Sequence, residues 1–206
     1  MGRPKRLGVM GGTFDPIHYG HLVTAEAALW KFSLDEVVFV PTGHPWMKEH
    51  QEVTPAEHRY LMTVIATASN PRFSVSRIEV EREGPTYAVE TLQELRRTAE
   101  EELELFFITG ADAILEIFQW KDPDEVLSMA HFIAATRPGY DIARFEQAAP
   151  AAAVNHPNIT VMDIPALAIS STDVRRRVRE GKPIRYLVPE GVHAYIHKMG
   201  LYAGSQ

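Results

Sequence analysis

Short runs of β-branched and aromatic residues alternate with amphipathic stretches along most of the chain. The runs cover residues 7–10, 37–40, 73–80, 103–108, 132–135 and 159–162. Strands that alternate with helices form right-handed β-α-β crossovers, and these build a parallel sheet that helices cover on both faces. The pattern therefore predicts an α/β fold with a doubly wound parallel sheet.

Several of the amphipathic stretches have a recognisable start. Thr54 offers an N-cap, Pro55 suits the first helical position, and Glu57 completes a capping box. Residues 122–125, with the sequence DPDE, repeat this order. A further helix is expected over residues 22–32, where apolar residues recur with helical spacing.

The chain is expected to form a single domain over residues 1–206. With 206 residues, of which 45% are hydrophobic, it is long enough to bury one good core. The sequence contains no internal repeat.

Two stretches fit the alternation of strands and helices poorly. Residues 43–53 are polar and suggest a working loop beside a site, whereas residues 139–157 suggest a surface excursion or a small mobile helix.

Composition excludes several classes of protein. The formal charge of −6 argues against a protein that binds nucleic acid, because such domains offset phosphate charge with a basic face. The absence of cysteine excludes disulfides, a thiolate nucleophile and a cysteine-ligated zinc site. No stretch approaches the roughly 20 apolar residues of a membrane helix. We therefore expect a cytoplasmic protein that binds neither nucleic acid nor membrane; its oligomeric state is open, and a homo-oligomer is allowed.

The strongest chemical signal follows the first predicted strand, where residues 11–21 read GGTFDPIHYGH. Glycines after a first parallel strand let a ligand approach the backbone closely, and the helix that follows directs N–H groups and a positive dipole at it. His18 and His21 flank Gly20, which has no side chain, so both imidazoles can reach one phosphate cluster. The segment predicts a phosphate cradle in which the histidines neutralise charge.

Other interpretations of this segment fit less well. It has neither the G-x-G-x-x-G spacing of a dinucleotide site nor the Gly-Lys-Ser/Thr of a P-loop, and the chain lacks the G-x-S-x-G elbow of a serine hydrolase. A metal site on His18 and His21 stays open as an alternative, but no set of nearby carboxylates completes it. A structural role, with the glycines in a tight turn and the histidines capping the helix, stays open for either feature alone.

A second signal lies near the C-terminus, where residues 169–175 read ISSTDVR. Ser171 and Thr172 can cap N–H groups at a helix start or offer hydroxyls to an anion, and Arg175 can fork onto phosphate oxygens. The C-terminal helical part, residues 168–206, is thus expected to carry a second anion-binding helix end. An ordinary N-cap with a solvated arginine face is the alternative. The other arginines of this helix are expected to be solvated: Arg176, Arg177 and Arg179.

Both segments resemble motifs of one superfamily. Residues 11–22 are similar to the signature of the nucleotidyltransferases that carry a T/H-x-G-H motif, and residues 169–175 resemble the I-S-S-T-x-x-R motif that its members use on the phosphates of ATP. The superfamily includes nicotinate- and nicotinamide-mononucleotide adenylyltransferases, phosphopantetheine adenylyltransferase and several cytidylyltransferases. The resemblance implies a Rossmann-like nucleotidyltransferase fold and the type of reaction, and it leaves the substrate open.

The middle of the chain carries the resemblance that bears on the substrate. Residues 84–92, GPTYAVETL, resemble the G-P/S-T/S-Y-x-x-x-T-L stretch of bacterial nicotinate-mononucleotide adenylyltransferases. This resemblance implies that the turn at Thr86 and Tyr87 receives the pyridine ring and its carboxylate. Free backbone N–H groups and a threonine hydroxyl at a helix start suit a carboxylate. A helix cap with Tyr87 in the core is the alternative.

The same resemblance implies roles for single residues elsewhere. Asp112 follows the strand at residues 103–108 and would bind a ribose, at the edge where doubly wound sheets hold their ligands. Trp120 would stack on the nicotinate ring, although a core tryptophan is also consistent with the sequence. Lys48, in a P-x-x-K loop, would bridge phosphates of both substrates. Arg137 would lie beside the adenine or the ribose.

These features together predict an enzyme that passes the adenylyl group of ATP to the 5′-phosphate of nicotinate mononucleotide, which gives deamido-NAD and pyrophosphate in NAD biosynthesis. Nicotinamide mononucleotide and phosphopantetheine are alternative acceptors, and a nucleotide-sensing regulator without turnover is an alternative class. Mg²⁺ would sit mainly on the ATP phosphates, with no metal site on the protein itself.

The expected catalytic residues are His18, His21, Lys48 and Arg175. The expected ATP-binding residues are Gly11, Gly12, Thr13, Phe14, His18, His21, Gly110, Asp112, Arg137, Ser171, Thr172 and Arg175. The expected residues for the pyridine nucleotide are Thr13, His44, Lys48, Thr86, Tyr87 and Trp120.

Overall fold

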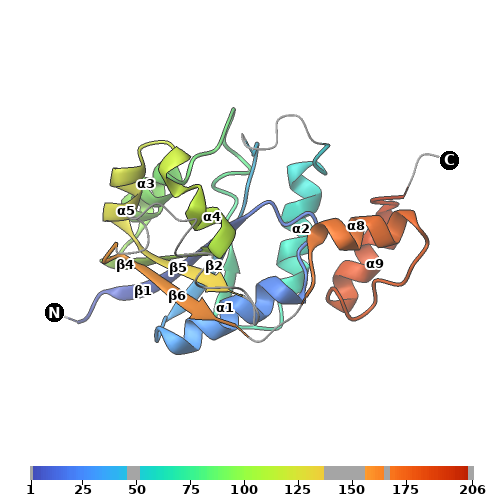
Figure 1. Cartoon of the computed structure of the whole chain (residues 1–206), viewed down its shortest axis with the longest axis horizontal. Helices are drawn as coiled ribbons and strands as arrows, with labels where there is room; N and C mark the ends of the chain where they lie inside the picture. The colour runs from blue at the N-terminus through green and yellow to red at the C-terminus, as the bar shows by residue number, and fades with distance from the viewer. Residues whose placement is uncertain (1, 46–51, 137–155, 165–167, 204–206) are drawn as a thin grey trace.

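The computed structural model describes residues 2–45, 52–136, 156–164 and 168–203 (Figure 1). Lys48 and Arg137 lie outside the described residues, as do most of the two stretches that fit the alternation of strands and helices poorly. Within the described ranges, no helix is long and apolar enough to cross a membrane.

The centre of the fold is a six-stranded parallel sheet in the order β3-β2-β1-β4-β5-β6. Each of the six predicted runs forms one strand. Their bounds are β1 Lys5–Gly12, β2 Glu36–Pro41, β3 Phe73–Val75, β4 Leu103–Gly110, β5 His131–Thr136 and β6 Ile159–Asp163. The prediction of a parallel, doubly wound α/β sheet is confirmed.

β3 is shorter than the predicted run, which extended to residue 80. β3 is an edge strand that pairs only with β2, and its last residue, Val75, lies opposite Phe39. If the pairing continued, residue 77 would lie opposite Pro41, which is the last residue of β2. Proline has no N–H to donate to a ladder, so the pairing stops and the chain leaves the sheet.

Helices cover both faces of the sheet (Figure 1). Alternate strand positions feed two cores: Met10 and Phe39 pack with α1, α2 and α9 on one face, whereas Val9 and Val38 pack with α3, α4 and α5 on the other. The helices are α1 Tyr19–Lys31, α2 Ala56–Thr67, α3 Ala88–Thr98, α4 Ala111–Leu115, α5 Pro123–Met129, α8 Ser171–Arg179 and α9 Glu190–Met199. α9 packs against α2, and α8 lies with it at one end of the molecule (Figure 1).

Two predicted helix starts need correction. α2 begins one residue after Pro55, which is the N-cap, so Thr54 does not cap the helix. The Thr54 N–H instead donates to the Asp15 carboxylate, which fixes the chain ahead of the helix. α5 begins at the predicted place, with Asp122 at the N-cap, but the Asp122 side chain makes no capping hydrogen bond. α1 begins three residues earlier than residue 22, at Tyr19.

Candidate active site

The carboxyl ends of β1 and β4 lie side by side in the middle of the sheet. From β1 the chain goes on to β2 and β3 on one side of the sheet, and from β4 it goes on to β5 and β6 on the other side. The direction of strand addition therefore reverses between β1 and β4. β1 ends at Gly12 and β4 ends at Gly110. Ligands of doubly wound folds bind in the crevice outside such a reversal point. Two cavities open here, and both are lined by Thr109.

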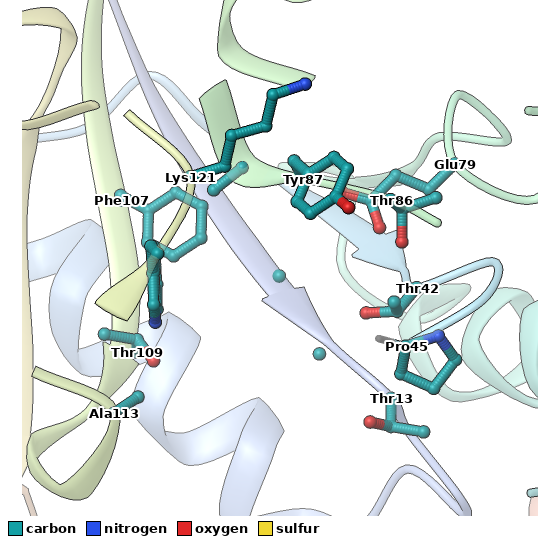
Figure 2. Close-up of a pocket in the computed structure, with 14 residues that line it drawn as sticks. Thr13, Thr42, Pro45, Glu79, Thr86, Tyr87, Phe107, Thr109, Ala113 and Lys121 are labelled. Carbon is teal, nitrogen blue, oxygen red and sulfur yellow. The ribbon is translucent and has the colours of Figure 1, made fainter. Parts of the chain in front are cut away.

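The first cavity has a volume of about 270 Å³ and a largely apolar wall. Figure 2 shows the residues that line it, which come from the ends of β1, β2 and β4, the start of α3 and the chain around Trp120. They are Gly11, Gly12, Thr13, Thr42, Pro45, Glu79, Thr86, Tyr87, Ala88, Phe107, Thr109, Ala113, Trp120 and Lys121. A cavity of this size and lining suits a small aromatic ring with a polar substituent.

Trp120 serves both the cavity and the core. It lines the cavity, and its ring meets Phe107 edge-on at a centroid distance of 5.8 Å and Phe132 at 6.4 Å. These contacts fix the indole plane, so a stacking surface would be held ready for a ligand ring. Next to it, the Lys121 ammonium lies 4.6 Å from the centre of the Tyr87 ring and 2.7 Å from a carboxylate oxygen of Glu90. Tyr87 and Trp120, both expected to contact the pyridine nucleotide, line the same cavity, and that contact stays a prediction.

The second cavity, of about 300 Å³, brings the N-terminal and C-terminal motifs together. It lies on the α1 face of the sheet, between the first turn of α1 and the start of α8. Its lining is Met10, His18, Gly20, His21, Thr24, Thr109, Gly110, Ala135, Ile164, Ile169, Ser170 and Ser171. Two helix N-termini and two imidazoles therefore meet at one point, which is an arrangement that favours an anion.

The two histidines form a stacked pair. Their ring centroids are 3.8 Å apart with an interplanar angle of 24°. The backbone N–H of His18, which is the N-cap of α1, donates to Nδ1 of the His21 ring at 3.2 Å. Because Nδ1 of His21 accepts this bond, the neutral ring carries its proton on Nε2 and is a donor there. A Cβ on Gly20 would lie 2.9 Å from the His18 ring. The glycine between the histidines is thus what allows the His18 ring to take its place.

Phe14 supports this pair from the core. The Phe14 side chain is buried and meets the His21 ring edge-on at 5.1 Å, with an interplanar angle of 87°. It lines neither cavity and packs against the His21 ring from the side of the core. The Phe14 ring thus helps to hold the histidine, and its assignment to the ATP site stays a prediction.

The start of α8 is tied to the N-terminal loop. The Ser171 hydroxyl donates to the Pro16 carbonyl at 2.9 Å, and the Arg175 guanidinium donates to the Asp15 carbonyl at 2.7 Å. Ser170, one residue before the helix, accepts the N–H of Asp173 and is the N-cap. Thr172 is exposed and lines neither cavity. Of the arginines expected to be solvated, Arg176 and Arg177 remain accessible but pair with Asp173.

Arg59 is a residue of this region that the sequence interpretation missed. Its side chain is 1% exposed, and it donates to the backbone carbonyls of four residues: Thr13, Thr42, Gly43 and Thr54. Burial lowers the pKa of the guanidinium because it disfavours the charged form. The carbonyl acceptors stabilise the buried charge by hydrogen bonding. Arg59 shares the buried face of α2 with Met62 and Ala66, at the i+3 and i+7 positions. A charged residue within that apolar stripe was the available signal.

The remaining predicted residues differ in their placement. Gly110 lines the second cavity. Asp112 lies in the first turn of α4 and is exposed, outside the lining of both cavities. The Thr86 N–H is not free, because it donates to the His44 carbonyl at 3.3 Å; this corrects the expectation for that turn. His44 itself has an exposed side chain. The ranges that the structure describes hold no group of three or more histidine, aspartate or glutamate residues that could bind a metal ion.

Comparison with known proteins identifies the family of the chain. Residues 9–177 match the cytidylyltransferase-like family. The chain is 59% identical over 201 residues to a probable nicotinate-nucleotide adenylyltransferase of Moorella thermoacetica, covering 97% of this chain and 93% of that protein. It is 56% identical over 204 residues to the protein of the same name from Saccharopolyspora erythraea, covering 99% and 92%. The chain belongs to the nicotinate-nucleotide adenylyltransferase family.

Solved structures of this family share the fold. The nicotinic acid mononucleotide adenylyltransferase of Plasmodium falciparum, solved in complex with NaAD, aligns with a TM-score of 0.71 over 96% of this chain and 97% of that one, at 23% identity. At this identity the match supports the fold alone. The family and the Rossmann-like nucleotidyltransferase fold that the motifs predicted are both confirmed.

Proposed function

We propose that this nicotinate-nucleotide adenylyltransferase family member transfers the adenylyl group of ATP to the 5′-phosphate of nicotinate mononucleotide, forming deamido-NAD and pyrophosphate as a step of NAD biosynthesis. The observation that carries the proposal is the pair of cavities at the ends of β1 and β4. One has an aromatic wall and the other collects imidazoles and helix N-termini, and Thr109 lines both. A pyridine ring and a polyphosphate need these two environments at a short distance.

The first cavity would receive the pyridine ring. Trp120 offers a flat surface to stack on, while the N-terminal end of α3 directs its positive dipole at the wall formed by Thr86 and Tyr87. A carboxylate on the ring is stabilised by that dipole more than a neutral carboxamide. Lys121 lines the same wall, but its ammonium is paired with Glu90 at 2.7 Å and adds little net charge. The dipole of α3 is the reason for proposing nicotinate over nicotinamide as the ring.

The second cavity would hold the phosphates of ATP. Nε2–H of His21 and the N-termini of α1 and α8 would meet developing negative charge on the phosphoryl oxygens. Arg175 and Ser171 would complete this set from α8. Further contacts are proposed from the resemblance: Lys48 to phosphates of both substrates, Asp112 to a ribose, and Arg137 beside the nucleoside. Thr172 is also proposed as a contact of the ATP phosphates.

The reaction needs positioning and charge stabilisation. An oxygen of the mononucleotide's 5′-phosphate attacks the α-phosphorus of ATP and forms a new P–O bond. The bond from that phosphorus to the oxygen that bridges to the β-phosphorus breaks, and its electron pair leaves with pyrophosphate. The phosphate nucleophile is already ionised at neutral pH, so no general base is required. The protein aligns the two groups and stabilises charge on the leaving oxygens.

Mg²⁺ is the metal ion proposed to accompany ATP. Mg²⁺ keeps several waters and binds substrate phosphates with few protein ligands, and a cavity rich in donors and poor in carboxylates fits an ion that arrives on the phosphates. When bound, it would neutralise phosphate charge. We also propose that residues 1–206 act as one domain in the cytoplasm.

Pyrophosphate release tests the proposal. ATP and Mg²⁺ are combined with nicotinate mononucleotide, nicotinamide mononucleotide or phosphopantetheine in separate reactions, and the products are identified by chromatography. Deamido-NAD formed fastest from the first acceptor supports the proposal. Faster turnover of another acceptor would reassign the substrate. ATP binding without pyrophosphate release from any acceptor would support a nucleotide sensor in place of an enzyme.

A further inference from the structure

A buried carboxyl group lies in the wall of the first cavity without a part in the proposed mechanism. Glu79 is 8% exposed and lines the cavity next to Thr86 (Figure 2). Its backbone is packed so closely that a Cβ on Gly43 would lie 2.0 Å from the Glu79 carbonyl oxygen. A buried carboxyl group is costly unless its oxygens are hydrogen-bonded, so its contacts indicate what it does.

Those contacts run to the first turns of α3. The Thr91 hydroxyl donates to the Glu79 carboxylate at 2.7 Å, while the Thr86 hydroxyl donates to the His44 carbonyl at 3.4 Å. Thr86 stands directly before the N-cap of α3, and Thr91 lies in its second turn. Glu79 therefore holds the N-terminal part of α3 through Thr91. The backbone of Thr86 is fixed from the other side by the His44 carbonyl.

The electrostatic surroundings of Glu79 are mixed. Burial raises the pKa of its carboxyl group, and the hydroxyl groups of Thr91 and Thr86 together with the positive charges of Arg82 and Arg59 oppose this. Arg59 comes from α2 and Arg82 from the segment before α3, where its guanidinium lies 3.4 Å from the Thr91 hydroxyl. Burial and these neighbours therefore act in opposite directions on the pKa of a carboxyl group beside a cavity that is proposed to receive an anion.

We propose that Glu79 is a positioning residue for the acidic substituent of the pyridine ring. By holding Thr91, it sets the place of the α3 N-terminus relative to the cavity. The binding of a carboxylate by a helix N-terminus depends steeply on that placement. No residue of α3 lines the second cavity, which is proposed to hold the phosphates of ATP. This inference rests on the proposed function, since it concerns the ring that the first cavity receives.

Thr91→Val tests the contact with little change of shape. We expect KM for nicotinate mononucleotide to rise about tenfold, as for loss of one hydrogen bond to a buried charged group, while kcat and KM for ATP stay within about twofold of wild type. Thr91→Ser keeps the hydroxyl and should restore KM. Thr98→Val is the matched control, because Thr98 lies on the same helix and its exposed hydroxyl bonds only to the Glu94 carbonyl. Thermal melting verifies that each variant is folded.

Glu79→Gln provides a second, independent measurement. In wild type, the carboxyl group gains negative charge as the pH rises through its raised pKa, so KM for the acid should rise relative to KM for nicotinamide mononucleotide. Titration of the 5′-phosphate cancels in this ratio because both nucleotides carry it. The ratio should be independent of pH in the variant.

Three results would overturn the inference. In the first, Thr91→Val has an unchanged KM for nicotinate mononucleotide. In the second, the KM values for both substrates rise together, which marks a general loosening of the fold. In the third, the ratio has the same pH dependence in Glu79→Gln as in wild type. Absence of any wild-type turnover with nicotinate mononucleotide would instead refute the proposed function, and this inference with it.

Discussion

Arg175 donates a hydrogen bond of 2.7 Å to the backbone carbonyl of Asp15, which lies 160 residues earlier in the chain. The carboxyl group of the same aspartate is buried, and it accepts a second long-range bond, from the hydroxyl of Tyr202 at 2.7 Å. The C-terminal helices are thus fastened to the loop that precedes His18. The N-termini of α1 and α8 face one cavity because this loop is held between them.

The first prediction concerns Tyr202. Tyr202→Phe removes the hydroxyl that donates to the buried Asp15 carboxylate, and we expect the free energy of unfolding to fall by about 1–3 kcal/mol. Burial beside Asp15 raises the pKa of this phenol, so the hydroxyl stays protonated as a donor throughout the working pH range. Denaturant unfolding measures the change. Tyr186→Phe is the control, since Tyr186 is 80% exposed, and equal stability of the two variants would refute the role given to this bond.

The second prediction concerns the glycine between the histidines. In Gly20→Ala the new Cβ would lie 2.9 Å from the His18 ring, so the ring must move out of its stack on His21. We expect kcat to fall by about 10²-fold, which is typical for loss of one preorganised donor. Steady-state pyrophosphate release measures it. Combined with His18→Ala, the Gly20→Ala change should cost no further activity, because the ring it displaces is already gone; additive losses would contradict this mechanism.

The third prediction concerns Arg59. Arg59→Met keeps the apolar stem but removes the donors for four backbone carbonyls, and we expect a loss of about 3–5 kcal/mol in stability. Urea unfolding measures this change. Arg72→Met is the matched control, since Arg72 is exposed and its ion pair with Glu26 spans 3.8 Å. A loss below about 1 kcal/mol in Arg59→Met would mean that other groups satisfy these carbonyls.

The sequence predicted those parts of the site in which neighbouring residues act together. The glycines and histidines of residues 11–21 and the serines before Arg175 are local patterns, and helix N-termini impose their chemistry wherever the helices lie. Arg59 and Glu79 could not be found in this way. Their roles depend on carbonyl and hydroxyl groups from other elements, such as Thr13 and Thr91, which only the packed fold brings near.

The same distinction explains the errors in the predicted elements. The length of β3 depends on where its neighbour, β2, meets Pro41. Thr54 has the chemistry of an N-cap, but its N–H is engaged by Asp15 from a loop 39 residues earlier. In each case the intrinsic preferences of the residues left two local conformations nearly equal in free energy, and a tertiary contact decided between them.

The last prediction separates the two histidines. His21→Ala removes the Nε2–H donor and should lower kcat by about 10²-fold or more with the fold intact, as for the loss of one electrostatic donor. His18→Ala should lower kcat to a similar degree, and it should also loosen the His21 ring, which loses its stacking partner at 3.8 Å. The double variant should therefore lose less than the product of the single losses, because residues in contact act as one unit. Circular dichroism verifies the fold, and pyrophosphate release gives kcat. Near-wild-type turnover in both single variants would show that the stacked pair does not serve the phosphates, and the second cavity would then need another role.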